Sequence, residues 1–224
     1  MNRESENLST ALPRGPRTAI RDSPVIKRLG LVDYQSAYAA MRRLTDERSA
    51  ATADELWVLE HPPLYTAGLG ARKEHLPRGS DIRLDHVDRG GQITYHGPGQ
   101  AIVYTLVDLS RRGLSVRAMV TLIEQAVIDT LAVHGVRAAR RSGAPGVYVD
   151  GAKIAALGLR VRRGCCYHGV ALNVNMDLAP FSAIDPCGYP GLAVTQASAL
   201  GIGAGAEELG DALARGIARG IDKP

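Results

Sequence analysis

A cysteine near the C-terminal end of the chain lies in a segment that is predicted to be a loop of defined shape. Cys187 stands between Pro186 and Gly188, and the pair Pro190-Gly191 follows shortly after. Proline fixes its own φ, whereas glycine adopts backbone angles that are closed to other residues. A thiol held in such a loop suits nucleophilic catalysis, which depends on the position of the sulfur and on its thiolate fraction. From this loop alone, a buried structural cysteine is the alternative interpretation.

A lysine is the second residue whose position suggests chemistry. Lys153 follows the dipeptide Asp150-Gly151 and opens the apolar segment 154–159. A lysine at the start of a strand is usually solvated. The alternative is that Lys153 faces a cleft beside Cys187, where an ammonium and a thiolate would stabilise each other near neutral pH.

The histidines and the remaining cysteines indicate no metal site. His96 and His168 each precede a glycine, and neither has metal-ligand spacing to the cysteines. Cys165 and Cys166 are adjacent, so their side chains should point to opposite faces of a strand, and we interpret them as packing residues. The stretch 89–100 holds four glycines and a proline but has neither the P-loop nor the dinucleotide-binding signature, so it is not predicted to bind phosphate.

The segments that must position these residues are short apolar strands and amphipathic helices. Strands are predicted at 24–31, 56–60, 101–109, 146–149, 153–159 and 167–174, with a loop over 66–87. Asp33 and Ser115 are predicted to cap two helices, and a third covers 207–217. The buried helix faces are predicted to hold Tyr34, Ala37, Tyr38, Met41 and Leu44 in the first helix and Val116, Met119, Val120, Ile123, Val127 and Leu131 in the second. Turns at 150–151 and 162–164 make the last three strands antiparallel. The sequence therefore predicts an α+β fold, with helices packed on a mixed or antiparallel sheet.

Composition restricts the class of protein. The chain has 224 residues, of which 45% are hydrophobic and 22% charged, which predicts a single globular domain over residues 25–224. Residues 1–24 are polar and rich in proline, arginine and serine, so we expect a disordered tail and no signal peptide. No apolar run is long enough to span a membrane. The net charge of +4 and the 4% aromatic content do not favour nucleic-acid binding. An adjacent cysteine pair suggests a reducing compartment, with the cytoplasm as the expected location.

Five blocks of the sequence carry a resemblance to one family. They are Glu60-His61-Pro62-Pro63, RGGQITYHGPGQ at 89–100, GVYVDGAKIAALGLRVRRG at 146–164, HGVALNVNMDL at 168–178 and IDPCG at 184–188. In order and spacing they resemble the lipoyl(octanoyl) transferases, over roughly residues 29–200. The resemblance implies the fold of the lipoate and biotin protein ligase catalytic domain.

The resemblance also implies an activity and a site. Family members transfer an octanoyl or lipoyl group from acyl carrier protein to a lysine of lipoyl domains in 2-oxoacid dehydrogenase and glycine cleavage proteins, the first step of endogenous protein lipoylation. Cys187 would form the thioester and Lys153 would act beside it, with no cofactor, metal, nucleic acid or membrane involved. The substrate-binding residues implied are Arg89, Gly90, Gly91, Gln92, Ile93, Thr94, Tyr95, His96, Ala156, Leu157, Gly158, Gly169, Val170 and Ala171.

The residues themselves are compatible with this chemistry. Exchange between a thiolate and a thioester is nearly isoenergetic and needs no ATP. Backbone N–H groups of the glycine-rich loops are expected to hold the developing oxyanion. Because acyl carrier proteins are generally acidic, Arg160, Arg162 and Arg163 are expected to dock the donor.

Three other functions remain open from the sequence. An ATP-dependent lipoate or biotin ligase of the same fold would not need Cys187. A cysteine hydrolase would pair Cys187 with His96 or His168 and release the acyl chain to water. A non-catalytic protein that binds lipoyl domains or acyl carrier protein would never become acylated.

Overall fold

The structure is a computed structural model and describes residues 22–223. Most of the predicted N-terminal tail, residues 1–21, lies outside the described residues. The described chain is built on two β-sheets, and the larger has seven strands in the order β1-β2-β6-β10-β9-β8-β7. These strands are β1 (Val25–Leu31), β2 (Glu55–Glu60), β6 (Gln100–Asp108), β7 (Ala139–Arg140), β8 (Val147–Val149), β9 (Ala152–Arg162) and β10 (Cys165–Asn173). Only the pair β1–β2 is parallel, so this sheet is mixed.

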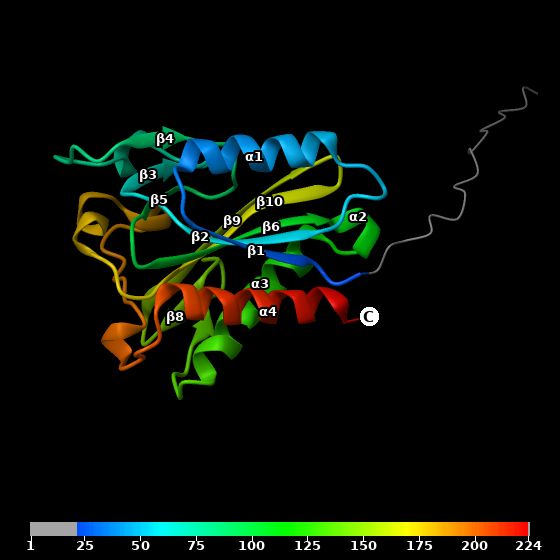
Figure 1. Cartoon of the computed structure of the whole chain (residues 1–224). Coiled ribbons are helices and arrows are strands. Elements are labelled where there is room, and N and C mark those ends of the chain that lie inside the picture. The colour runs from blue at the N-terminus through cyan, green and yellow to red at the C-terminus, as the bar shows by residue number, and fades with distance from the viewer. Residues whose placement is uncertain (1–21, 224) are drawn as a thin grey trace, which may run out of the picture.

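Helices cover both faces of the large sheet (Figure 1). α1 (Tyr34–Glu47) packs on one face, whereas α3 (Val116–Ala132) and α4 (Ala206–Asp222) pack on the other. α2 (Leu109–Arg112) is a single turn after β6. Asp33 and Ser115 cap α1 and α3 as predicted, since each side chain accepts a hydrogen bond from the backbone three residues on. The predicted α+β class with a mixed sheet is confirmed.

The two hairpins that carry β8, β9 and β10 also form as predicted. Asp150 and Gly151 have φ values of +47° and +83°, and Arg163 and Gly164 have +52° and +79°. Two consecutive residues at positive φ match the twist of an antiparallel hairpin. β10 pairs with β9 so that Ala171 faces Ala156 and Gly169 faces Gly158. This register places small residues side by side on one face of the sheet.

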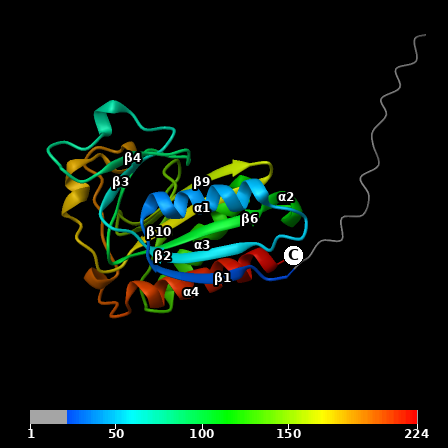
Figure 2. The ribbon, with the colours of Figure 1, turned by 45° about the horizontal axis from the view of Figure 1, so that its top comes forward.

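A second sheet was not predicted. It has three strands in the order β4-β3-β5, namely β4 (Leu84–His86), β3 (Leu64–Ala67) and β5 (Ile93–His96). The prediction of a loop over 66–87 is therefore wrong at both of its ends. Strands of three or four residues are too short to show alternation in the sequence. In Figure 2 this sheet lies beside the chain that follows β10, and its Tyr65 and Tyr95 pack with Phe181 and Ile184 of that segment. The small sheet thus supports the segment that leads to Cys187.

Four 3₁₀ turns complete the described elements. They are η1 (Lys73–His75), η2 (Ala179–Ala183), η3 (Pro186–Gly188) and η4 (Ser198–Leu200). Cys187 lies in η3, on the segment between the large sheet and α4.

We predict that Asp54 is the most important single charge for stability. Its buried carboxylate accepts hydrogen bonds from Arg48, Arg111 and Arg112 at 2.6–2.8 Å and from the Asp108 N–H at 2.9 Å. Burial alone would raise the pKa of Asp54, but these donors outweigh it and the pKa is lowered. Asp54→Asn should lower the free energy of unfolding at pH 7 by about 3–5 kcal/mol, because it leaves buried guanidinium groups without their counter-ion. Urea unfolding measures this.

The pH dependence of stability checks the same ion cluster. Because the folded-state pKa of Asp54 is lowered, its contribution is present above its unfolded pKa of about 3.9 and is lost as pH falls through the folded value. Asp54→Asn should therefore lose less stability than wild type on acidification. Glu74→Gln is the matched control, since Glu74 makes an exposed ion pair with Arg72 and should change stability by less than about 1 kcal/mol. An equal loss of unfolding free energy in Asp54→Asn and Glu74→Gln would contradict this prediction.

Candidate active site

Cys187 has a backbone conformation that is rare for a residue with a side chain. Its φ is +56°, and the next residue, Gly188, has a φ of +75°. A non-glycine residue in the left-handed region is under mild strain, and such positions cluster at functional sites. The sulfur belongs to a partly exposed side chain, and none of the cysteines of the chain is in a disulfide. The loop therefore presents a reduced thiol at a fixed position.

Both ends of the Cys187 loop are tied to other elements. On its N-terminal side, the Asp185 carboxylate accepts hydrogen bonds from His75 at 2.9 Å and Arg78 at 2.7 Å. On its C-terminal side, the segment after the loop runs beside the start of β9: the N–H of Lys153 donates to Ala193, and its carbonyl accepts from Thr195. These contacts hold Cys187 over the first residues of β9.

Lys153 and Cys187 are in direct contact. Lys153 Nζ lies 2.9 Å from Cys187 Sγ, donates to the Pro145 carbonyl at 3.0 Å, and lies 5.2 Å from the centre of the Tyr148 ring. The lysine is buried, with 3% of its surface exposed. A Cβ on Gly146 would lie 3.2 Å from Nζ and 2.7 Å from the Ala155 carbonyl, so glycine is needed where Lys153 passes. Burial would lower the pKa of Lys153, but the Cys187 thiolate and Tyr148 outweigh it, and the pKa is raised. The geometry thus places the lysine nitrogen in hydrogen-bond contact with the cysteine sulfur.

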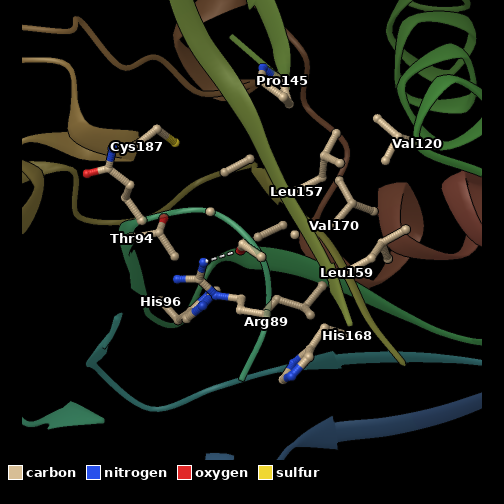
Figure 3. A pocket seen from close by; sticks show the side chains of 18 of the residues that line it. Arg89, Thr94, His96, Val120, Pro145, Leu157, Leu159, His168, Val170 and Cys187 are labelled. Carbon is tan, nitrogen blue, oxygen red and sulfur yellow. Dashed lines mark hydrogen bonds between the residues drawn. The ribbon is translucent and has the colours of Figure 1, made fainter. Parts of the chain in front are cut away.

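A cavity of about 400 Å³ opens beside this pair. Figure 3 shows Cys187 and Pro145 at one end of the cavity and His168 at the other, with Leu157, Val170 and Leu159 between them. Every predicted substrate-binding residue except Tyr95 lines the cavity. The lining set is Arg89, Gly90, Gly91, Gln92, Ile93, Thr94, His96, Ala156, Leu157, Gly158, Gly169, Val170 and Ala171. Three segments far apart in the sequence therefore meet at one cavity.

Tyr95 points away from the cavity. Side chains alternate along β5, and the Tyr95 ring packs against Tyr65 and Phe181 at centroid distances of 5.5 Å. Its prediction as a substrate-binding residue is therefore not matched by its place in the fold, where it supports the segment before Cys187.

Polar side chains gather at the far end of the cavity, away from the thiol. The buried Arg89 guanidinium donates to the carbonyl and hydroxyl of Thr66 at 2.7 and 2.8 Å and to the Gly90 carbonyl at 3.0 Å. His96 bonds to Gln100 at 2.8 Å, and burial lowers the pKa of His96 to about 3. His168 bonds to Asp88 at 3.2 Å, and burial lowers its pKa as well. Both histidines are therefore neutral near pH 7, and within residues 22–223 neither is hydrogen-bonded to Cys187.

Several cavity residues were not predicted. They are Tyr34, Ile102, Tyr104, Val116, Val120, Pro145, Leu159, His168 and Tyr189. Val116 and Val120 were assigned to the packed face of α3, but Val116 is 46% exposed and both line the cavity. A helix that borders a cavity shows the same apolar spacing as one that packs on a sheet. The sequence pattern therefore gave no signal that separates the two.

The three arginines expected to dock a donor have partners in the chain. Arg160 lies 3.9 Å from Asp88 and Arg162 lies 3.2 Å from Asp46, and both arginine side chains are about 40% exposed. Arg163 donates to the Asp46 carbonyl at 3.4 Å. Their role in docking stays a prediction.

Two further findings concern the described part of the chain. Among residues 22–223, no three His, Cys, Asp or Glu side chains are arranged to hold a metal ion. Over the same residues, no helix is long and apolar enough to cross a membrane.

Known proteins resemble the chain in sequence and in fold. The family model described as the lipoyl protein ligase A/B catalytic domain matches residues 33–218. An octanoyltransferase from Thiobacillus denitrificans is 55% identical over 96% of this chain and 99% of its own length. A crystal structure of lipoate-protein ligase A bound with ATP has a TM-score of 0.70 and 16% identity, covering 89% of this chain and 85% of that one. Biotin protein ligase from Aquifex aeolicus has a TM-score of 0.56 and 13% identity, covering 88% and 70%.

The two structural neighbours bear on the fold alone, because their sequence identities are low. The predicted likeness to the lipoate and biotin ligase catalytic domain is thereby confirmed at the level of architecture. The near-full-length relative at 55% identity bears on the family and confirms the predicted acyltransferase class. The chain thus belongs to the lipoyl protein ligase A/B catalytic domain family, and within it to the lipoyl(octanoyl) transferases.

Proposed function

We propose that the chain transfers an octanoyl group from the thioester of acyl carrier protein to a lysine of lipoyl domains, through a thioester on Cys187. The observation that carries the proposal is the 2.9 Å contact between Lys153 Nζ and Cys187 Sγ at one end of a largely apolar cavity. A thiolate stabilised by a buried ammonium is an activated nucleophile, and the cavity beside it can hold an apolar chain.

In the first step, the Cys187 thiolate attacks the carbonyl carbon of the donor thioester. The carbonyl π electrons move to oxygen, and the tetrahedral intermediate collapses with loss of the donor thiolate. The Lys153 ammonium gives its proton to that leaving thiolate, so the donor departs as a neutral thiol and Lys153 becomes neutral. One thioester breaks and one forms, so no nucleotide is consumed.

In the second step, the acceptor lysine attacks the Cys187 thioester as a free amine. Neutral Lys153, fixed against the Pro145 carbonyl, takes the proton that the nitrogen loses on forming the amide. Cys187 leaves as a thiolate next to the restored ammonium. Lys153 thus gives a proton in one step and takes one back in the other.

The cavity suits a medium-length acyl chain. Leu157, Leu159 and Val170 provide apolar contact, and the neighbouring glycines and alanines leave room for the chain. Burying an alkyl chain contributes on the order of 0.8 kcal/mol per CH₂.

We predict that a larger side chain in the cavity shortens the acyl chain that the protein accepts. Ala156→Leu should lower kcat/KM for octanoyl donor by about tenfold or more and have less effect on a butanoyl donor, because the added carbons occupy the slot. Competition between the two donors measures the ratio. An unchanged ratio would mean that the acyl chain does not bind in the slot beside Ala156.

The partners follow from the same proposal. The donor is the acidic acyl carrier protein, and we propose that the partly exposed Arg160 and Arg162, with the neighbouring Arg163, provide positive charge for its docking. The acceptors are lipoyl domains of 2-oxoacid dehydrogenase and glycine cleavage proteins. Free thiols fit a cytoplasmic location. The proposal includes no nucleic acid, membrane, metal or other cofactor.

A transfer assay separates this function from its alternatives. Mixed with octanoyl-acyl carrier protein and a lipoyl domain without ATP, the protein should add one octanoyl group to the lipoyl domain, as read by mass spectrometry. A requirement for ATP and free octanoate would indicate a ligase. Free octanoate released without modified domain would indicate a hydrolase, and binding with no acyl movement would indicate a non-catalytic protein.

A further inference from the structure

Thioester chemistry on Cys187 creates a negatively charged oxygen in each step, and the structure narrows down what can stabilise it. The glycine-rich loops were the expected source of N–H donors, but several of these groups are already engaged. Five glycine N–H groups already donate hydrogen bonds to acceptors within the protein, namely those of Gly68, Gly70, Gly90, Gly99 and Gly188. The N–H of Tyr189 also donates, to the Pro186 carbonyl at 3.1 Å. The two residues that follow the thiol therefore offer no free backbone donor.

A side-chain amide lies against the Cys187 loop at this point. A Cβ placed on Gly188 would lie 2.2 Å from both Nε2 and Oε1 of Gln92. The amide of Gln92 therefore occupies the space where a side chain at 188 would be, next to the residue that carries the thiol. Gly188 is needed for this approach as well as for its positive φ.

The Gln92 amide is also uncommitted. Its Oε1 is buried and has no hydrogen-bond partner among residues 22–223. An unpaired buried amide oxygen is costly and calls for an explanation. Because no donor holds this oxygen, the amide can turn about its last side-chain torsion and present Nε2 to the cavity without losing a hydrogen bond. The backbone is fixed meanwhile, since the Gln92 carbonyl accepts from the Gly68 N–H at 3.0 Å.

We propose that the side-chain amide of Gln92 is the oxyanion donor of this site, binding the acyl oxygen of the tetrahedral intermediates formed on Cys187. This inference rests on the proposed function and assigns a catalytic role within it. In each step the carbonyl oxygen gains the electron pair when the nucleophile adds and returns it when the thiolate leaves. Gln92 Nε2–H donates to that oxygen throughout and transfers no proton. Lys153 remains the group that moves protons.

The test compares two reactions of the same thiol. Gln92→Met keeps the length of the side chain and its contact with Gly188 but removes the donor. Acylation of Cys187 by an octanoyl thioester should slow by about 10²–10³-fold, the usual cost of one oxyanion donor. Alkylation by iodoacetamide develops no oxyanion on a carbonyl, so its rate should stay within about twofold of wild type. Both rates are read by intact mass, with Cys165 and Cys166 replaced by serine.

Gln125→Met is the matched control, since Gln125 is exposed on the outer side of α3 and the chemical change is the same. It should leave both rates unchanged. If acylation in Gln92→Met equals that of wild type, the inference is wrong. If alkylation falls together with acylation, Gln92 only shapes the loop, and the inference is equally wrong. Failure of the wild-type protein to acylate at all would instead overturn the proposed function.

Discussion

Cys187→Ser is expected to abolish octanoyl transfer to the lipoyl domain, with a loss on the order of 10⁴-fold or more. The fold should tolerate the change, because the side chain is small and partly exposed. A serine hydroxyl in contact with Lys153 stays protonated near pH 7 and is a much weaker nucleophile than the thiolate on which the proposed mechanism depends. The initial rate of octanoylated lipoyl domain, read by mass spectrometry, measures the effect.

Cys165→Ser is the matched control for this prediction. Cys165 is buried in β10, and within residues 22–223 the only hydrogen bond of its thiol is a long one to the Arg163 carbonyl, at 3.8 Å. It should retain transfer activity close to wild type. Equal loss in both variants would mean that the transfer does not depend on the position of Cys187.

Lys153→Met is expected to lower transfer by about 10²–10⁴-fold, the usual range for a positioned acid–base group. It should also slow the alkylation of Cys187 at pH 7, because the neighbouring ammonium that stabilises the thiolate is gone. Lys153→Arg separates the two roles of the lysine. Arginine keeps the positive charge and should preserve alkylation, but it does not readily exchange a proton and should still lose transfer.

The rate of alkylation by iodoacetamide, measured against pH, reports the thiolate fraction of Cys187. It is measured for wild type and the two Lys153 variants, each with Cys165 and Cys166 replaced by serine. Transfer rates on the same proteins check the proton transfers. Identical alkylation profiles for wild type and Lys153→Met would show that the lysine does not activate the thiol. Full transfer activity in Lys153→Arg would show that no proton passes through this position.

The sequence predicted the long elements of the fold because their signals are local. Capping by Asp33 and Ser115 and the turn at Asp150-Gly151 depend on a few neighbouring residues, and each formed as expected. The small sheet was missed because its strands are only three or four residues long, and their pairing joins segments separated by loops. Long-range pairing of this kind leaves no periodicity in the sequence.

The site was predictable in its residue types but not in its geometry. The family resemblance pointed to Cys187 and Lys153. The loop that holds Cys187 next to Lys153, however, is shaped by contacts of Asp185 with His75 and by the segment after residue 192. Those contacts link residues that are far apart in the sequence, as in the bond from His75 to Asp185. The approach of Gln92 to Gly188 has the same origin: it is a tertiary contact between the residue that precedes β5 and the last residue of η3, and no spacing within either segment encodes it.

The most direct test of the account is the mass of the protein after it meets an acyl donor alone. Incubated with octanoyl-acyl carrier protein and no lipoyl domain, the wild-type chain should gain one octanoyl group, located to the peptide that contains Cys187 and released by hydroxylamine. Adding lipoyl domain should then discharge that group onto the domain. A protein that supports transfer without ever carrying the group, or that carries it on a peptide lacking Cys187, would contradict the thioester mechanism.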